Sequence, residues 1–208
     1  MTMKIGTDES GKGDYFGYLV VAAVAAGPAD EKKLQQLRIR DSKLISDNEV
    51  KRLAALIKKV CNFSVVKISP EKYNLLHKKF RNLNKILSWA HARAIENLLE
   101  KGNADIIIVD KFADDSLLKK QLFEKGRKIK LIQTVRGERD TAVAAASILA
   151  RAEFLSSLRK LSLQVGYKLP KGAAHVDEAL KFLTEKYGPE VLEGIAKVHF
   201  KTTKKVKK

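Results

Sequence analysis

The chain has 208 residues, 45% of them hydrophobic, which is enough to bury a sizeable core. A formal net charge of +17, from 41 Lys and Arg against 24 Asp and Glu, favours nucleic acid as a partner over an anionic membrane surface. The single cysteine, Cys61, excludes an internal disulfide, and the first residues lack the apolar core of a signal peptide. We therefore expect a soluble, cytoplasmic protein that binds no membrane.

The first motif, residues 6–17, sets two adjacent carboxylates beside a glycine-lysine-glycine loop. Residues 4–7 and 18–26 are predicted to form the arms of a β-hairpin around it. Neighbouring side chains of a strand point to opposite faces, so Asp8 and Glu9 can share an ion only near a strand end or a bulge. Carboxylate oxygens at such a place suit Mg²⁺ or Mn²⁺.

The middle of the chain alternates between helical and strand patterns. Ser46 is the predicted N-cap of a helix over 47–59, and the β-branched residues of 63–68 predict a strand. Ser69 precedes a proline that opens a short helix. Apolar residues at helical spacing over 83–100, followed by Gly102, predict a longer helix.

A second acidic position follows an apolar run over 104–109. The run predicts a strand buried on both faces, with Asp110 at its carboxyl end, where α/β sheets place their chemistry. Another strand, 129–134, leads to Glu138 and Asp140 and then to an alanine-rich helix over 141–161. Helices are also predicted over 176–187 and 190–198, before a basic tail, 201–208, that we expect to be disordered.

Two interpretations of these acidic positions remain open on the residues alone. In the functional one, carboxylates clamp two divalent ions for phosphoryl transfer. In the structural one, Asp110 pairs with a lysine, and Glu138 or Asp140 caps the following helix. The paired acids with the glycine-lysine-glycine loop have no obvious structural purpose, which favours a metal-dependent enzyme acting on a polyanion.

The motif from Asp8 to Gly17 resembles the signature of type 2 ribonucleases H, in the ribonuclease HIII form with serine and lysine in place of alanine and arginine. Further segments resemble the family in the same order and extend the resemblance over nearly the whole chain. They are Asp41-Ser42-Lys43, residues 83–99 with Trp89-Ala90-His91-Ala92, Val109-Asp110, residues 143–148, residues 169–173 and His199-Phe200-Lys201.

The resemblance implies an α/β fold with a ribonuclease H-like mixed sheet flanked by helices and a helical carboxyl-terminal portion. It implies endonucleolytic hydrolysis of the RNA strand of RNA/DNA hybrids by two-metal-ion catalysis, giving 5′-phosphate and 3′-hydroxyl ends. Asp8, Glu9 and Asp110 carry over as metal ligands for Mg²⁺ or Mn²⁺. Glu138 is expected as the fourth ligand, ahead of its competitor Asp140.

Other matching positions are expected to contact the substrate. The backbone amides of the Gly11-Lys12-Gly13 loop, which follows Ser10, can approach the ribose 2′-hydroxyl. Lys12 and Lys43 are suited to phosphate contacts, with solvated surface lysines as the alternative. Ser147 could touch the substrate backbone or simply pack within its helix, and we expect His91 to be a packing histidine rather than a catalyst.

The chain departs from the resemblance at its amino end. Ribonuclease HIII proteins usually carry a separate amino-terminal substrate-binding domain, whereas here the catalytic motif begins at residue 8. We expect a naturally short form, a monomer with no obligate protein partner, folded as one catalytic domain over 1–200. The alternatives are a ribonuclease HII-like nuclease acting on single ribonucleotides in DNA, a related nuclease acting on DNA, and a non-catalytic hybrid-binding protein.

Overall fold

In the computed structural model, residues 2–37, 39 and 45–205 are described. The chain divides into two compact units. The first comprises residues 1–9, 21–66 and 83–152, and the second comprises residues 10–20, 67–82 and 153–208. Three strands and the longest described helix continue from one unit into the other, so the division cuts through secondary structure.

A five-stranded mixed sheet has the strand order β3-β2-β1-β4-β5. Its strands are β1 (Lys4–Ser10), β2 (Leu19–Ala26), β3 (Asn62–Ile68), β4 (Ile106–Asp110) and β5 (Lys130–Thr134). The strands β1, β4 and β5 run parallel, with Thr7 opposite Val109 and Asp110 opposite Thr134. The carboxyl ends of these three strands therefore meet at one edge of the sheet.

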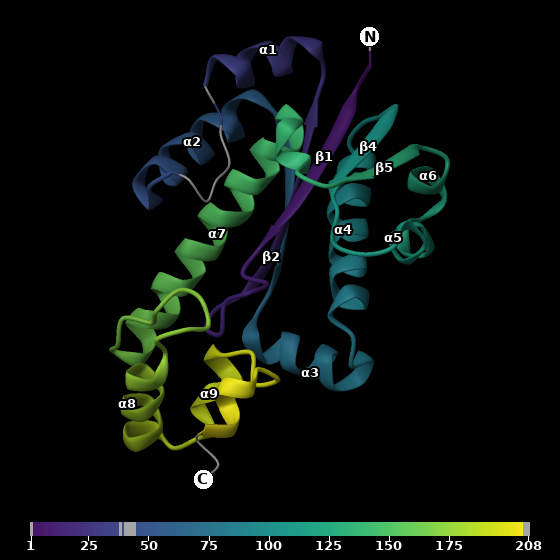
Figure 1. Ribbon diagram of the computed structural model, residues 1–208. Helices are drawn as coiled ribbons and strands as arrows, with labels where there is room; N and C mark the ends of the chain where they lie inside the picture. Colours follow the sequence, from purple (N-terminus) through teal and green to yellow (C-terminus); the bar gives the residue numbers. More distant parts are fainter. Residues whose placement is uncertain (1, 38, 40–44, 206–208) are drawn as a thin grey trace. The chain divides into compact units, whose positions relative to one another are not determined.

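The helices of the first unit are α1 (Pro28–Gln36), α2 (Asp47–Val60), α4 (Leu83–Leu99), α5 (Asp115–Gln121) and α6 (Glu124–Arg127), with the 3-10 helix η2 (Gly137–Arg139). The helix α7 (Thr141–Val165) begins in this unit. Figure 1 shows α7 and α4 on opposite sides of β1. A Cβ on Gly6 would lie only 2.3 Å from the Ala142 carbonyl carbon, so this glycine lets α7 pack directly on β1.

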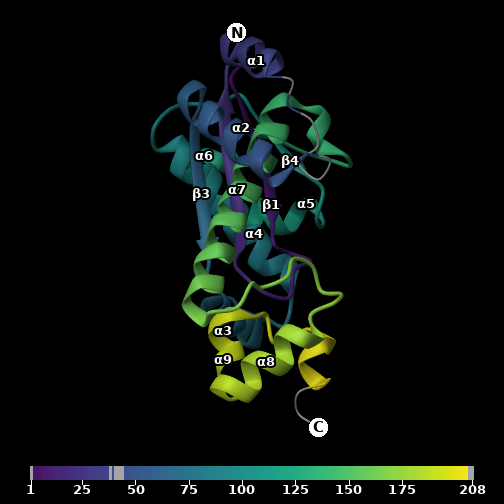
Figure 2. The same cartoon turned by 90° about the vertical axis from the view of Figure 1, so that its left-hand side faces the viewer.

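The second unit contains the helices α3 (Pro70–Phe80), α8 (Asp177–Tyr187) and α9 (Val191–Ile195), the 3-10 helix η3 (Lys201–Lys205) and the end of α7. The helix α9 packs against both α3 and α8, which Figure 2 shows beside it. Asn74 on α3 donates hydrogen bonds to the carbonyl oxygens of Glu193 and Ala196. The amide of Asn74 thus satisfies backbone groups left unpaired at the end of α9.

Most predicted elements are present with shifts of a few residues. Ser46 caps α2, since its hydroxyl accepts from the backbone N–H of Glu49. Three helices were not predicted: α1, whose Pro28 stands at the first helical turn, and the short helices α5 and α6. Gly27-Pro28 does end β2 as predicted, but a proline can also open a helix, and here it does.

Two structural expectations need correction. The strand β4 is not fully buried on both faces, because only Ile107 and Val109 of its residues are buried. The strand that is covered on both faces is β2, which has seven of its eight residues buried. The tail was expected to be disordered from residue 201, whereas residues 201–205 form η3. There the Thr203 hydroxyl lies 3.0 Å from the Tyr15 hydroxyl, a buried hydrogen bond that anchors the tail.

The helix α7 is long and apolar enough to cross a membrane by composition alone, and it is the one described helix that is. However, 72% of its most apolar 18-residue window is buried inside the protein. Its alanine-rich first half is almost wholly enclosed, from Ala142 to Ala150. These features are those of a core helix.

Candidate active site

The predicted acids gather at the carboxyl ends of β1 and β4. The last registered pair of these parallel strands is Thr7 with Val109, so Asp8 and Asp110 are the next residues on each strand. In-register residues of parallel neighbours share a face, which places both carboxylates on the side of the sheet that α7 covers. The structure therefore brings together two acids that lie 102 positions apart in the sequence.

The surroundings of the Asp8 carboxyl group shift its pKa upwards. Burial, the charge of Glu9 and the charge of Asp110 together raise the pKa of Asp8 to about 7. Hydrogen bonds to the Asp8 carboxylate from Ser147 and from the Glu9 backbone N–H oppose this rise. A buried carboxyl group whose pKa is raised in this way is typical of a site that binds a cation or handles a proton.

Glu9 points to the opposite face of β1, where α4 lies. Its side chain is only 7% exposed, and His91 Nε2 lies 3.2 Å from Glu9 Oε2. The other ring nitrogen of His91 is 2.9 Å from the Thr7 hydroxyl, and the ring stacks on Phe112 with 4.6 Å between centroids. An ionised carboxylate only accepts hydrogen bonds, so in such a pair the His91 Nε2–H donates to Glu9. His91 is thus buried and hydrogen-bonded, as expected, and it also holds Glu9.

Asp110 is fixed by the segment that carries the fourth predicted ligand. The backbone N–H of Gly137 donates to Asp110 Oδ1 at 2.9 Å. A Cβ on Gly137 would lie 3.0 Å from the Asp110 Cα, so glycine allows η2 to approach β4 this closely. The next residue, Glu138, is half-buried on η2, and no hydrogen bond or ion pair of its side chain occurs among the residues that the structure describes.

The competitor Asp140 has a structural task. Its Oδ1 accepts hydrogen bonds from the backbone N–H groups of Ala142 and Val143, which caps the amino end of α7. Its Oδ2 lies 3.3 Å from Lys4 Nζ, and Lys4 also pairs with Glu31 at 2.7 Å. Both oxygens of Asp140 therefore have partners, whereas Glu138 directly follows Gly137, whose backbone N–H bonds Asp110.

The glycine-lysine-glycine loop belongs to the second unit. Gly11 and Gly17 both have positive φ, +86° and +91°, which favours glycine. Lys12 and Gly13 are exposed, while Tyr15 and Phe16 are completely buried. The loop thus presents its tip to solvent while the aromatic residues behind it anchor it.

Two predicted substrate contacts have different outcomes. Lys43 lies outside the described residues. Ser147 is 7% exposed and bonds to Asp8, so its hydroxyl supports a carboxylate. The sequence did not predict the Ser147–Asp8 bond or the His91–Glu9 bond. Its signal for each is a polar residue on the apolar face of a helix.

The donor set suits a hard divalent cation, because every candidate ligand is a carboxylate oxygen. Burial and the neighbouring charge of Glu9 raise the pKa of Asp8, and a bound cation would favour its ionised form. Within the described part of the chain, no three His, Cys, Asp or Glu side chains are already arranged to hold an ion. Since the carboxylates repel one another without a cation, they would have to turn towards an ion to share it.

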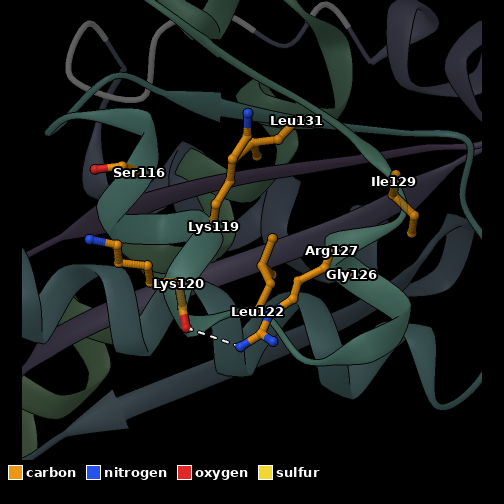
Figure 3. Close-up of a pocket in the computed structure, with 8 residues that line it drawn as sticks. All are labelled: Ser116, Lys119, Lys120, Leu122, Gly126, Arg127, Ile129 and Leu131. Atoms are coloured by element: carbon orange, nitrogen blue, oxygen red, sulfur yellow. Dashed lines mark hydrogen bonds between the residues drawn. The ribbon is translucent and has the colours of Figure 1, made fainter.

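A hollow of about 500 Å³ in the first unit is lined by residues other than these carboxylates (Figure 3). Apolar residues of its lining include Leu122, Ile129 and Leu131, and cationic ones include Lys119 and Arg127. The Arg127 guanidinium donates to the Lys120 carbonyl oxygen at 3.4 Å across it. None of the predicted site residues lines this hollow.

Comparison with known proteins places the chain among nucleases. The family model described as Ribonuclease HII matches residues 5–203. A Ribonuclease HIII from Protochlamydia amoebophila is 44% identical over 203 residues, which is 97% of this chain and 67% of the relative. A Ribonuclease HIII from Chlamydia pneumoniae is 46% identical over 96% of this chain and 68% of its own length. The chain therefore spans about two thirds of these relatives.

Solved structures agree with this placement. The crystal structure of Bst-RNase HIII in complex with Mn²⁺ matches with a TM-score of 0.91 and 34% identity, over 98% of this chain and 68% of that one. The Aquifex aeolicus RNase H3 structure matches with a TM-score of 0.77 and 36% identity, over 94% and 71%. The predicted fold class and family are confirmed. The chain belongs to the type 2 ribonuclease H family that the Ribonuclease HII model describes, and its relatives within that family are ribonucleases HIII.

Proposed function

We propose that this ribonuclease H is an endoribonuclease that hydrolyses the RNA strand of RNA/DNA hybrids and leaves 5′-phosphate and 3′-hydroxyl ends. The observation that carries the proposal is the convergence of Asp8, Glu9 and Asp110 at the ends of two parallel strands. The hydrogen bond from Gly137 to Asp110 adds the segment that bears Glu138. These acids are the positions that the ribonuclease H signature requires, and they come from both halves of the sequence.

Asp8, Glu9, Asp110 and Glu138 would hold two divalent ions, Mg²⁺ or Mn²⁺. When bound, such ions activate the attacking water and stabilise the leaving oxygen. The Mn²⁺ complex of the structural neighbour Bst-RNase HIII supports this choice of metal. In this mechanism the carboxylates would hold the metal ions in place and would not act as nucleophiles.

The chain's own residues prepare these ligands. His91 fixes the Glu9 carboxylate on one face of β1, and Ser147 fixes Asp8 on the other. The Gly137 N–H holds Asp110. These hydrogen bonds limit the orientations that Asp8, Glu9 and Asp110 can take before an ion binds.

Substrate recognition follows from charge and from the exposed loop tip. The net charge of +17 attracts the nucleic-acid backbone without reading its sequence. The loop of Gly11, Lys12 and Gly13, preceded by Ser10 and exposed at Lys12 and Gly13, would bring backbone amides to the ribose 2′-hydroxyl, which distinguishes RNA from DNA. Lys12 and Lys43 would contact phosphates. Ser147 would act on the substrate only indirectly, through Asp8.

We further propose that the chain acts as a cytoplasmic monomer with one catalytic domain over 1–200. The decisive experiment compares two end-labelled duplexes, a continuous RNA/DNA hybrid and DNA with a single ribonucleotide, in Mg²⁺ and then in Mn²⁺. Metal-dependent cleavage of the hybrid supports the proposal. Cleavage at the single ribonucleotide alone would favour the ribonuclease HII-like alternative, and no cleavage of either duplex would favour a non-catalytic hybrid-binding protein.

A further inference from the structure

Lys197 is the most deeply buried cation in the described part of the chain, with 0% of its surface exposed. It lies just after α9, in the second unit. A buried lysine is costly unless its ammonium group has partners. Its Nζ donates at 2.8 Å to the carbonyl oxygens of Asp14 and Gly17, and it lies 5.8 Å from the centre of the Tyr73 ring, within cation–π range.

Both carbonyl groups belong to the loop of residues 11–17, which we call the recognition loop. The backbone of Lys197 also holds this loop, since its N–H donates to the Tyr15 carbonyl oxygen at 2.8 Å. One residue near the carboxyl end thus bonds three carbonyl groups of the recognition loop. Among the described residues, no carboxylate accepts from its Nζ, so the lysine is used here as a multiple donor to backbone rather than as half of an ion pair.

Other contacts fix the two ends of the recognition loop, but they do not duplicate the two hydrogen bonds from Lys197 Nζ. Gly172 accepts from the Tyr15 N–H and donates to the Asp14 carboxylate, and the Gly17 N–H donates to the Ile195 carbonyl oxygen. A Cβ on Gly11 would lie 2.1 Å from the Tyr18 carbonyl oxygen, so the loop closes tightly. The Lys197 Nζ bridges the carbonyl groups of two separate loop residues, Asp14 and Gly17.

We propose that Lys197 is a positioning residue for substrate recognition: by bridging Asp14 and Gly17 it fixes the curvature of the recognition loop and so the direction of the amides of Gly11, Lys12 and Gly13. This inference rests on the proposed function, in which those amides read the ribose 2′-hydroxyl. Lys197 itself touches neither substrate nor metal. Its loss should therefore weaken binding of the hybrid more than it slows the chemical step.

The test replaces Lys197 with methionine, which keeps an unbranched side chain but removes the donors. Hydrogen exchange at the amides of residues 11–17 should become faster, and KM for the RNA/DNA hybrid should rise about tenfold while kcat changes less than about threefold, as expected for lost binding interactions. The control is Lys204→Met, which removes one positive charge from the exposed surface of η3 and should leave both readouts unchanged. Unchanged exchange in the recognition loop of Lys197→Met would overturn the proposal, as would a KM equal to that of the control.

A second variant covers misfolding of Lys197→Met. In a Cys61→Ala background, Lys197→Cys can be alkylated with 2-bromoethylamine while unfolded and then refolded, which restores an amine at nearly the original length. Recovery of the slow exchange and of the low KM would support the bridging role, and recovery of neither would overturn it. The exchange result decides the role of Lys197 even if the wild-type chain cleaves no hybrid, an outcome that would instead contradict the proposed function.

Discussion

Asp110 Oδ1 accepts a 2.9 Å hydrogen bond from the backbone N–H of Gly137, and this bond joins the end of β4 to the segment that carries Glu138. The contact depends on the absence of a side chain, because a Cβ on Gly137 would stand 3.0 Å from the Asp110 Cα and 3.2 Å from its Cβ. One glycine therefore controls the separation of two proposed metal ligands.

Gly137→Ala should push η2 away from β4. We expect turnover of the hybrid to fall about tenfold or more, because small misplacements of catalytic groups are costly, with a loss of about 1–3 kcal/mol in the free energy of unfolding. Steady-state cleavage and urea unfolding measure the two effects. Gly102→Ala is the matched control, since a Cβ there meets nothing within 4 Å. Turnover equal to that of the control would show that the close approach is not needed.

Substitutions of Glu138 and Asp140 should have clearly different effects on turnover. Glu138→Gln should lower turnover on the order of 100-fold or more, because a proposed ligand charge is lost, with little change in stability. Asp140→Asn should retain near wild-type turnover, since asparagine can still cap α7, and it should lose only the ion pair with Lys4. Side-by-side cleavage assays and thermal melts distinguish the two residues; a collapse of turnover in Asp140→Asn alone would make Asp140 the fourth ligand.

Asp8 should destabilise the metal-free protein at neutral and higher pH. Burial and the charge of Glu9 raise its pKa from an ordinary value of 3.8 to about 7 in the folded chain, so the folded state holds the proton more tightly. Stability contributed by this group is therefore complete below about pH 4 and is lost as pH rises through 7. Asp8→Asn should exceed wild type in stability at about pH 8 in EDTA, by up to about 1.4 kcal/mol for each unit of pKa, and less at about pH 5.

Urea unfolding at several pH values measures this difference. Adding Mn²⁺ at about pH 8 should stabilise the wild type but not Asp8→Asn, because only the wild type gains a carboxylate ligand. Equal stability of the two proteins at every pH would contradict the crowding of carboxylates at this edge.

Lys197 should make the free energy of unfolding rise with pH, whereas Asp8 makes it fall. Burial lowers the pKa of Lys197 to about 7, from 10.5. Between these values the unfolded chain holds more protons, so the stability of the wild type should rise with pH relative to Lys197→Met, by up to about 1.4 kcal/mol per pH unit. Denaturant titrations of both proteins at about pH 7 and about pH 9 measure the slope. A pH-independent difference would show that Lys197 keeps its proton in the folded chain throughout this range, as it does in the unfolded chain.

Local patterns predicted much of this molecule. The cap at Ser46, the helical spacing over α4 and the apolar run before Asp110 act over a few residues, so they are visible in the sequence. The pattern also predicted that Asp8 and Glu9 lie near a strand end, where the two could share an ion, and the structure has them at the end of β1 with their side chains on opposite faces. The family motifs supplied the fourth ligand region, which spacing alone left open.

The supporting contacts were not predictable in the same way. His91 lies 82 positions from Glu9, and Lys197 lies 180 from Gly17, so only the folded chain brings them together. A polar residue on an apolar helix, such as Ser147, is visible in sequence, but its partner is not. The helices α5 and α6 escaped prediction because they are too short to show a clear apolar period.

The most direct test of the central claim compares wild type with Asp110→Asn on an end-labelled RNA/DNA hybrid, measuring cleavage in Mg²⁺ or Mn²⁺ and binding in EDTA. If carboxylates at the ends of β1 and β4 hold the catalytic ions, the variant will bind the hybrid at least as well as wild type, because an anionic side chain facing phosphate is gone, yet it will not cleave it. Cleavage by Asp110→Asn at a rate close to that of wild type would contradict the assignment of the metal site.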